Sequence, residues 1–417
     1  MKSWSRPWVP RLPGNGQPPR LFDTSTSTFV STVTSGTASL YVCGITPYDA
    51  THLGHASTYL AFDILVRSWL DAGYDVDYVQ NTTDVDDPLL ERATLLGIDW
   101  RVLAESQTEL FRGDMEALSI IPPDHYVPVT AVIPEVAAAV DALVVGGFAY
   151  EVPSAESIDS APDLYFDSAE AGEATSWHLG LESNLDRADM LALFAERGGD
   201  PDRPGKRDPL DPLLWRAARA GEPVWDTVLG LGRPGWHIEC SVIAVNRLGS
   251  SITVQGGGAD LLFPHHEFSA AHATALTGEP FARIYSHAGM IAYDGEKMSK
   301  SLGNLVLVSR LIEGGADPRA IRLALLGHHY RHDWEWTDDA LVAAGTRLAL
   351  WRAWAEREQH GAPAIDSLIA ALRVALSDDL DTVAALDAVD RAVASGTAPG
   401  TAALDAVHAL LGIDLRS

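Results

Sequence analysis

The hydrophobic pattern of the first hundred residues predicts a strand, a helix and a second strand. Residues 39–49, "SLYVCGITPYD", form a short apolar run that ends in a turn, as a buried strand does. Residues 52–73 carry apolar side chains at helical spacing, and a glycine ends that pattern. Residues 74–87 alternate between apolar and polar side chains and then become polar. Such a unit builds a parallel sheet, which binds ligands at the carboxyl ends of its strands, here near Cys43–Tyr48 and Asn81–Asp84.

The rest of the chain predicts an α/β domain that is interrupted by an insertion and followed by helices. Strand patterns return at 250–258 and 283–293, whereas 88–205 is mainly helical apart from an acidic, loop-like stretch at 151–175. From about residue 316, helical patterns rich in Ala and Leu continue to the end. The expected organisation is a Pro-rich extension (1–36), the first half of a nucleotide-binding α/β domain (37–95), a mainly helical insertion (96–205), the second half of that domain (206–315) and a C-terminal helical domain (316–417).

Composition indicates a globular protein and lowers the expectation of a nucleic-acid ligand. Of the 417 residues, 47% are hydrophobic and 21% are charged, and no apolar run reaches the roughly 18 residues of a membrane span. The N-terminal segment lacks the apolar core of a signal peptide, so we expect a cytoplasmic protein without membrane contact. The net charge is −27, and residues 333–417 hold fourteen acidic side chains against six arginines. Because basic surface binds nucleic-acid backbones, this balance favours a small-molecule ligand.

Two of the four lysines, Lys297 and Lys300, lie in one short segment, "DGEKMSKSLGN" (294–304). Ammonium groups beside Ser hydroxyls on a Gly-flanked loop suit phosphate oxygens. "HLGH", from His52 to His55, stands at the start of the first predicted helix, where imidazoles and helix N-terminal amides also suit phosphates. Either segment alone also fits an ordinary surface turn. As a pair they resemble the HIGH and KMSKS signatures of class I aminoacyl-tRNA synthetases, which surround ATP in that family.

The two cysteines, Cys43 and Cys240, lie far apart in the sequence, and a structural disulfide is not expected in a cytosolic chain. Together with His265 they offer two thiolates and an imidazole, a soft donor set that suits tetrahedral zinc with one position open. The spacing is not that of a zinc finger. From the pattern alone, two separate buried thiols and a surface histidine pair are therefore the better interpretation.

Five segments resemble, in the same order, the successive motifs of cysteinyl-tRNA synthetase. They are "YVCGITPYDATHLGHASTYLAFD", "NTTDVDD", "GRPGWHIECS", "GGGADLLFPHHE" and "GEKMSKSLGN". The resemblance implies a Rossmann-like class I catalytic domain and one zinc ion per chain that binds the thiolate of substrate cysteine. The matching metal ligands are Cys43, Cys240 and His265. The family's fourth ligand, a Glu, corresponds to Ser269, so it is missing or is replaced by Glu267; a three-ligand zinc leaves a position for the substrate sulfur.

Three features favour a shorter paralogous family, the L-cysteine:glucosaminyl-inositol ligases of mycothiol biosynthesis. The chain ends about a hundred residues after the lysine segment with an acidic region, it begins with a Pro-rich extension, and "ERGGDP" (Glu196 to Pro201) resembles a signature of the ligases. From the residues alone ERGGDP is a turn at a helix end, and the resemblance implies a loop that closes over the adenylate.

This resemblance implies two half-reactions. Cysteine and MgATP form cysteinyl-adenylate and pyrophosphate, and the amine of glucosaminyl-inositol then forms an amide and releases AMP. We therefore expect three small-molecule substrates (L-cysteine, ATP and glucosaminyl-inositol), no nucleic acid, and a monomer.

The resemblance also assigns residues to the parts of this reaction. The catalytic residues at the phosphates are expected to be His52, His55, Lys297 and Lys300. The aminoacyl end is assigned Gly44, Ile45, Thr46, Thr58, Asn81, Thr82, Thr83 and Trp236. The nucleotide is assigned Gly258, Ala259, Asp260, Ile291, Met298, Ser299 and Ser301, with Asp260 accepting from the ribose hydroxyls.

Two questions stay open from the sequence. No residue stands out as the base for amide formation: Asp84, Asp86 or Asp87 can help to deprotonate the amine, although at least two of them are expected to be capping or salt-bridging residues. The alternatives to the ligase are a cysteinyl-tRNA synthetase with a shortened C-terminus and a non-catalytic paralogue that binds zinc or nucleotide. Intact HLGH and KMSKS segments speak against the non-catalytic protein, which has no physical need for both.

Overall fold

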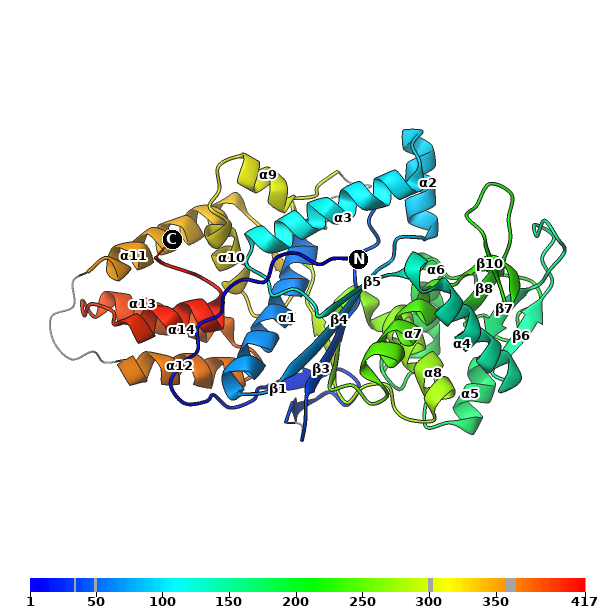
Figure 1. The fold of residues 1–417 in the computed structure, drawn as a ribbon, viewed down its shortest axis with the longest axis horizontal. Helices are drawn as coiled ribbons and strands as arrows, with labels where there is room; N and C mark the ends of the chain where they lie inside the picture. The colour runs from blue at the N-terminus through cyan, green and yellow to red at the C-terminus, as the bar shows by residue number, and fades with distance from the viewer. Residues whose placement is uncertain (34, 49–50, 299–302, 358–364, 417) are drawn as a thin grey trace.

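A five-stranded parallel sheet lies at the centre of the protein (Figure 1). The structure, a computed structural model, describes residues 1–33, 35–48, 51–298, 303–357 and 365–416. The sheet has the order β12-β11-β3-β4-β5, and all of its neighbouring strands run parallel. Its strands are β3 (Ala38–Val42), β4 (Val76–Thr82), β5 (His125–Pro128), β11 (Val254–Gly258) and β12 (Tyr285–Ala288). The α/β fold expected from the sequence is confirmed.

Side chains of the central strands alternate between two hydrophobic cores. Leu40 and Val42 pack in a core with helix α1 (Leu53–Ala72), whereas Tyr41 and Cys43 pack in a second core with α7 (Trp236–Leu248) and α8 (Glu267–Thr277). Successive residues of a strand point to opposite faces, so the sheet is covered on both sides. Figure 1 shows α1 on one side of the sheet and α7 and α8 on the other.

A second, antiparallel sheet follows the order β6-β7-β8-β10-β9. Its strands are β6 (Ala149–Val152), β7 (Asp163–Phe166), β8 (Leu213–Ala217), β9 (Trp225–Thr227) and β10 (Gly230–Pro234), and its helices are α4 (Ile133–Val145), α5 (Ser168–Ala174) and α6 (Arg187–Glu196). The sequence predicted only helices and a loop over 96–205. All four residues of β7 are buried, so the strand lacks the alternation that would have identified it. β5 also falls in this segment, yet it pairs with β4 of the central sheet.

Helices surround the central sheet on the side of α1. They are α2 (Asp87–Leu96), α3 (Trp100–Ala117), α9 (Val308–Glu313), α10 (Pro318–Leu326), α11 (Asp338–Ala355), α12 (Ile365–Ser377), α13 (Thr382–Ala394) and α14 (Thr401–Leu411). Short elements are the hairpin β1 (Arg20–Asp23) and β2 (Thr28–Ser31), the strands β13 (Ile291–Tyr293), β14 (Glu296–Lys297) and β15 (Trp334–Glu335), and the turns η1 (Val129–Ala131), η2 (Ala259–Leu261) and η3 (Leu262–His266). The hairpin lies in the Pro-rich extension predicted over residues 1–36.

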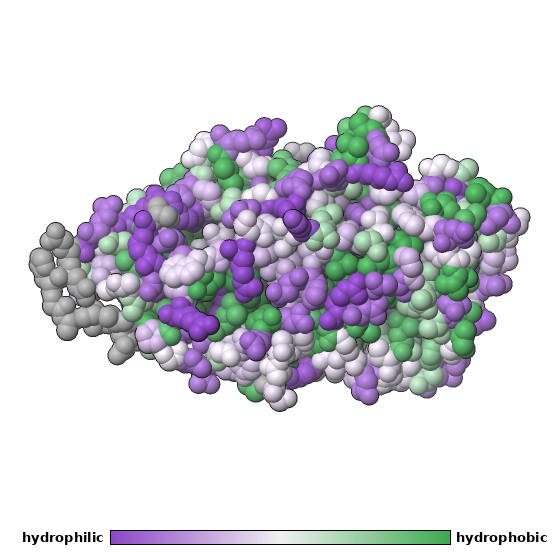
Figure 2. Space-filling view, in the orientation of Figure 1, coloured by the Kyte–Doolittle hydropathy of each residue, from purple (hydrophilic) through white to green (hydrophobic). Residues whose placement is uncertain are grey.

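The surface is mixed in character. Figure 2 shows polar and apolar side chains interspersed over one face, with an apolar tip at the end of α2, where Leu95, Leu96 and Ile98 are exposed. In the part of the chain that the structure describes, no helix combines the length and the apolar character needed to cross a membrane.

Candidate active site

A cleft of about 720 Å³ opens at the carboxyl ends of β3, β4 and β11. This is the edge at which a parallel α/β sheet binds its ligands. Twelve of the residues assigned from the sequence line the cleft: Cys43, Gly44, Ile45, Thr46, His52, His55, Thr58, Trp236, Gly258, Asp260, Ile291 and Met298. Ala259, Asn81, Thr82 and Thr83 do not line it. One cleft thus brings together segments that the sequence separates by more than two hundred residues.

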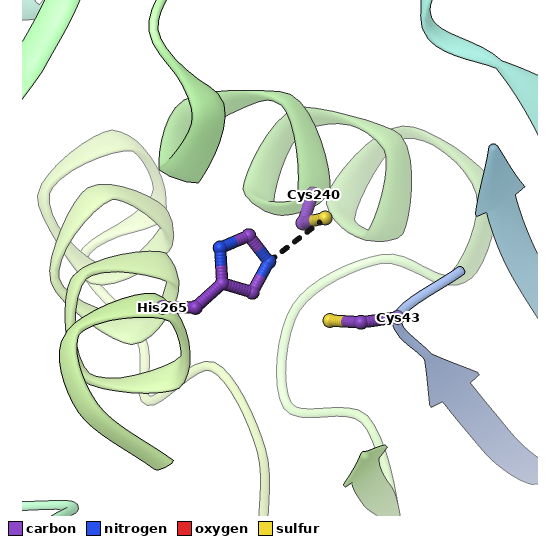
Figure 3. Close-up of side chains that lie close together, drawn as sticks. All are labelled: Cys43, Cys240 and His265. Atoms are coloured by element: carbon purple, nitrogen blue, oxygen red, sulfur yellow. Dashed lines mark hydrogen bonds between the residues drawn. The ribbon is translucent and has the colours of Figure 1, made fainter. Parts of the chain in front are cut away.

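Cys43, Cys240 and His265 form a buried cluster beside this cleft, and of the three Cys43 is the one that lines it. Cys43 follows β3, Cys240 lies on α7, and His265 lies on η3. Their ligand atoms all lie within 4.8 Å of one another, and His265 Nε2 is 3.2 Å from Cys240 Sγ. Figure 3 shows the two sulfur atoms and the imidazole pointing toward a common centre.

The cluster fits a zinc ion. Bond lengths of about 2.3 Å to sulfur and 2.0–2.1 Å to nitrogen put tetrahedral ligand atoms about 3.6 Å apart, close to the separations seen here. Burial and the neighbouring Cys43 sulfur raise the pKa of the Cys240 thiol well above its usual range. A thiol in such surroundings becomes a thiolate when a cation binds it, so the donor set suits a soft divalent metal.

Glu267 is not a member of the cluster, although the sequence left it as a possible fourth ligand. Its two carboxylate oxygens accept hydrogen bonds from the backbone N–H groups of Gly180 and Ser183, each at 2.9 Å. Ser269, at the position of the expected Glu, donates its hydroxyl to the backbone carbonyl of His237. Among the residues that the structure describes, the cluster therefore has three members.

Histidines that the sequence analysis missed form hydrogen-bonding contacts with residues of the cluster. His237 Nδ1 lies 3.0 Å from Nδ1 of His265, which leaves the other ring nitrogen of His265 facing Cys240. His266 Nε2 lies 3.3 Å from Cys43 Sγ, and its Nδ1 lies 2.8 Å from His287 Nε2. Burial lowers the pKa of His237 to about 3 and that of His287 to about 4, so these rings are neutral hydrogen-bonding groups at neutral pH.

At the other end of the cleft, His52 and His55 begin helix α1. His52 is the N-cap, and its Nδ1 accepts a hydrogen bond from the Gly54 N–H at 3.1 Å. The two imidazole rings lie 4.0 Å apart. Within the described residues Nδ1 of His55 has no hydrogen-bond partner, and burial lowers the pKa of this imidazole to about 4. A neutral ring with a free polar atom at a helix N-terminus is suited to a phosphate oxygen.

The residues that the sequence analysis assigned to the aminoacyl group belong to closely packed segments at the ends of β3 and β4. A Cβ on Gly44 would lie 1.6 Å from the backbone oxygen of Asn81, so only glycine fits there. The Asn81 side chain accepts from the Gly44 N–H at 2.7 Å, and the Ile45 carbonyl accepts from the Thr83 N–H at 3.0 Å. Asn81 and Thr83 therefore position the residues that line the cleft, as does Thr82, which is buried beneath them.

Comparison with known proteins places this geometry in a family. Residues 29–346 match the family described as tRNA synthetases class I (C) catalytic domain. The L-cysteine:1D-myo-inositol 2-amino-2-deoxy-alpha-D-glucopyranoside ligase of Clavibacter michiganensis is 61% identical, over 100% of this chain and 99% of the relative. The ligase of the same name from Micrococcus luteus is 58% identical over 100% of both chains. The chain belongs to this ligase family.

The fold of this family member also resembles solved structures of class I synthetases. Methionyl-tRNA synthetase of Mycobacterium tuberculosis, in complex with methionyl-adenylate, matches with a TM-score of 0.63 and 17% identity, over 90% of this chain and 88% of that one. At this identity the likeness shows the fold.

The "ERGGDP" segment of this ligase-family chain joins the cleft. Glu196, Arg197, Gly198, Gly199 and Asp200 all line it. The Arg197 guanidinium donates to the backbone carbonyls of Asp260 and Phe263, which ties this segment to the one that follows β11. Trp236, on the opposite side, stacks on His265 with ring centroids 4.3 Å apart.

Part of the expected phosphate site lies outside the described residues. Ser299, Lys300 and Ser301 fall there, and for Lys297 the structure describes the backbone alone, which pairs with Ala292. Met298, between them, is buried and lines the cleft beside Ile291.

Proposed function

We propose that the protein joins L-cysteine to the amine of glucosaminyl-inositol with ATP as the energy source, through a cysteinyl-adenylate. The observation that carries the proposal is the buried Cys43–Cys240–His265 cluster, which reaches through Cys43 into a cleft that His52 and His55 also line. A site for a thiol and a site for phosphates thus share one cavity. The names of relatives that match the whole chain support the same reaction.

In the first half-reaction, a carboxylate oxygen of cysteine attacks the α-phosphorus of MgATP and pyrophosphate leaves. Charge builds on the phosphoryl oxygens, so aligned donors and cations supply most of the stabilisation. We assign His52 and His55 to these oxygens as hydrogen-bond donors, with Lys297 and Lys300 as the cations. Asp260 and Ile291 hold the ribose and adenine, together with Gly258, which lines the cleft near them.

Cys43, Cys240 and His265 would hold a zinc ion. Such an ion would supply a soft Lewis acid for the thiolate of substrate cysteine and would so favour cysteine over serine. The protein's own contribution is positional. Trp236 stacks on His265 and closes the wall beside the amino acid, while Asn81 fixes Gly44 and so shapes the opposite wall.

In the second half-reaction, the acceptor nitrogen attacks the carbonyl carbon of the adenylate, and the bond from that carbon to the phosphate oxygen breaks to release AMP. The adenylate is already reactive, so holding both groups in one cleft does most of the work. We further propose that the enzyme acts as a cytoplasmic monomer on small molecules alone. The acidic helices at the C-terminal end support a small acceptor over RNA.

The test is cysteine-dependent formation of AMP from ATP, with and without glucosaminyl-inositol, in the absence of tRNA. We expect a large stimulation by the amino sugar and a new cysteinyl amide that a thiol reagent labels. His55→Ala should lower this activity by about 100-fold or more, because a donor to the developing charge is lost. His125→Ala, on the exposed edge of β5, is the matched control and should retain it.

Other outcomes identify the alternatives. Adenylate formation without any effect of the amino sugar, followed by cysteinylation of added tRNA, would identify a cysteinyl-tRNA synthetase. No cysteine-dependent turnover of ATP would identify a non-catalytic paralogue and refute the proposal.

A further inference from the structure

Three carboxylates follow strand β4, and the structure separates their roles. Asp84 is buried, and its carboxylate accepts hydrogen bonds from both the backbone N–H and the hydroxyl of Thr130. These bonds tie the end of β4 to the turn η1, which follows β5. Asp84 is thus fully engaged in holding two neighbouring strands together.

Asp87 is engaged in an ion-pair network. Its Oδ1 pairs with Arg216 Nη1 at 2.9 Å and with Arg233, which also donates to Glu222 at 2.9 Å. The network joins the start of α2 to β8 and β10 of the antiparallel sheet. Because it pairs with both guanidiniums, Asp87 holds these two parts of the protein together.

Asp86 differs from both neighbours. Like Asp87 it lines the cleft, but its Oδ1 caps helix α2 by accepting from the Asp87 N–H at 2.9 Å. Within the described residues, Asp86 Oδ2 makes no hydrogen bond, so one oxygen of this carboxylate is available to a ligand. A capping carboxylate is also held in a fixed direction, since the cap orients its side chain.

The position of Asp86 puts it beside the reaction centre. The stretch from Thr83 to Asp86 follows β4, and Thr83 is hydrogen-bonded to Ile45, next to Thr46 in the wall of the same cleft. On the other side, Asp86 interacts electrostatically with Glu239, which directly precedes Cys240 on α7. Asp86 is therefore close to the strand end and to the helix that supply Cys43 and Cys240.

Its surroundings give Asp86 an unusual proton affinity. Burial, and then the charge of Asp87, raises the pKa of the Asp86 carboxyl to about 6, while Arg216 and Arg233 oppose this rise. The other titratable group facing it is Glu239 on α7, whose own carboxyl pKa is raised well above its usual range by burial. A carboxylate of this basicity is still ionised at neutral pH and accepts a proton more readily than an ordinary aspartate.

We propose that Asp86 is the residue that receives the amine of the acceptor and takes its proton during amide formation. This inference rests on the proposed function. As the C–N bond forms and the bond from the carbonyl carbon to the AMP oxygen breaks, the nitrogen loses one proton to Asp86 Oδ2 and AMP leaves with the bonding electrons. The carboxylate returns the proton to water after product release.

The test is Asp86→Asn, measured separately on the two half-reactions. Asparagine caps helices as well as aspartate does, so α2 is retained. Cysteine-dependent exchange of pyrophosphate into ATP should stay within about a factor of two of the wild type, because Asp86 has no role in activation. Amide formation with glucosaminyl-inositol should fall by about 100-fold or more, the usual contribution of a positioned base.

Two further readouts separate a base from a merely structural residue. In the wild type, the rate of amide formation should decrease as the pH falls through about 6. In Asp86→Asn the rate should not show this decrease. Hydroxylamine is unprotonated at neutral pH and needs no base, so it should trap the adenylate equally fast in both proteins. The matched control is Asp99→Asn, which alters the N-cap of α3 outside the cleft and should leave both half-reactions unchanged.

Each remaining outcome has one meaning. If Asp86→Asn forms the amide as fast as Asp99→Asn does, or if it loses pyrophosphate exchange as well, Asp86 is not the acceptor base. If the wild type exchanges pyrophosphate but never forms an amide with the amino sugar, the proposed function itself fails, and the role of Asp86 fails with it.

Discussion

The protein contains two buried polar clusters, one on each side of its central sheet, and they do different work. Asp63, Arg67 and Arg322 lie on the side of α1, whereas Cys43, Cys240 and His265 lie on the side of α7. Every member of both clusters is at least 95% buried. Burial and titratable chemistry therefore do not distinguish a functional cluster from a structural one. The difference lies in which groups meet: a carboxylate with guanidiniums in one cluster, and three possible metal ligands in the other.

The Asp63 cluster is closed. The Asp63 carboxylate accepts from Arg67 Nε at 2.8 Å, from Arg322, and from the Ile121 N–H at 2.9 Å. The remaining guanidinium N–H groups donate to backbone carbonyls at the ends of α3 and α14, which joins these helices to α1. Burial opposes ionisation of Asp63, but the two guanidiniums outweigh it and lower the pKa of the carboxyl.

The cysteine–histidine cluster is open. Its three ligand atoms face one another, with His265 Nε2 3.2 Å from Cys240 Sγ, and its outer hydrogen bonds come from His237 and His266. Thiols and imidazoles gain little from contact with one another, so this arrangement is stable with a cation at its centre. We therefore expect the Asp63 cluster to hold helices together and the cysteine–histidine cluster to bind a metal ion. The following predictions test this difference.

The largest effect is expected on folding. Arg322→Met should lower the free energy of unfolding by about 3–5 kcal/mol, because it removes one partner of a buried carboxylate and leaves backbone carbonyls unpaired. Chemical denaturation measures this change. The zinc content and the activity of the folded fraction should be those of the wild type. A loss of metal without a loss of stability would contradict the assignment of this cluster to structure.

The second-largest effect is expected on zinc binding and on the rate of cysteine activation. Cys240→Ser should abolish stoichiometric zinc binding and lower cysteine activation by more than the about 10–100-fold that changes outside the ligand set cause. Elemental analysis and pyrophosphate exchange measure the two quantities. The matched control is Ser269→Ala, at the position where related synthetases carry a fourth ligand. Loss of zinc in the control would mean that the cluster has a ligand beyond the three assigned to it.

A smaller effect, on zinc affinity, is expected from a residue that contacts a metal ligand. His237→Phe removes the hydrogen bond to His265 while keeping the volume of the ring, and it should weaken zinc binding by about 10–100-fold. Competition with a chelator gives this affinity. Unchanged zinc affinity would show that packing alone orients His265, whereas a lowered melting temperature of the metal-free protein would reveal a structural role for His237.

The smallest effect concerns an exposed ion pair of the same chemistry as the Asp63 cluster. Arg20 and Asp378 pair at 2.7 Å, but their side chains are 53% and 59% exposed. Arg20→Gln should therefore cost less than about 1 kcal/mol, and the difference should shrink at high salt. Denaturation at low and high salt tests this, with Arg322→Met as the buried counterpart that salt leaves unchanged. A large, salt-independent loss for Arg20→Gln would mean that burial does not set the strength of these pairs.

The sequence predicted the elements whose pattern is local. The strands at 39–49 and 74–87 and the helix at 52–73 were recognised because alternation and helical spacing are visible within one segment, and the capping His52 marks the helix start. The antiparallel sheet was missed, since its strands are three to five residues long and β7 is buried throughout. Short strands of this kind are specified by partners far away in the sequence.

The residues of the candidate site likewise include some that the sequence predicted and some that it did not. Cys43, Cys240 and His265 were found because their residue types and a family resemblance point to a metal. His237 and His266 were not, although both lie within three residues of a ligand, and this proximity was the available signal. Asp63 pairs with Arg67 four residues later, a helical spacing visible in the sequence, whereas its second partner, Arg322, lies 259 residues away and carried no local signal. Asp86 could be distinguished from Asp84 and Asp87 only in the structure, in which the two neighbouring carboxylates bind other residues of the protein.

The most direct test of the open cluster is X-ray absorption at the zinc edge of the metal-loaded protein, with and without L-cysteine. We predict two sulfur ligands from Cys43 and Cys240 and one nitrogen from His265 in the absence of substrate. Adding cysteine should raise the sulfur count to three, whereas adding serine should leave it at two. A sulfur count that stays at two with saturating cysteine would show that the metal at this cluster does not bind the thiol of the substrate.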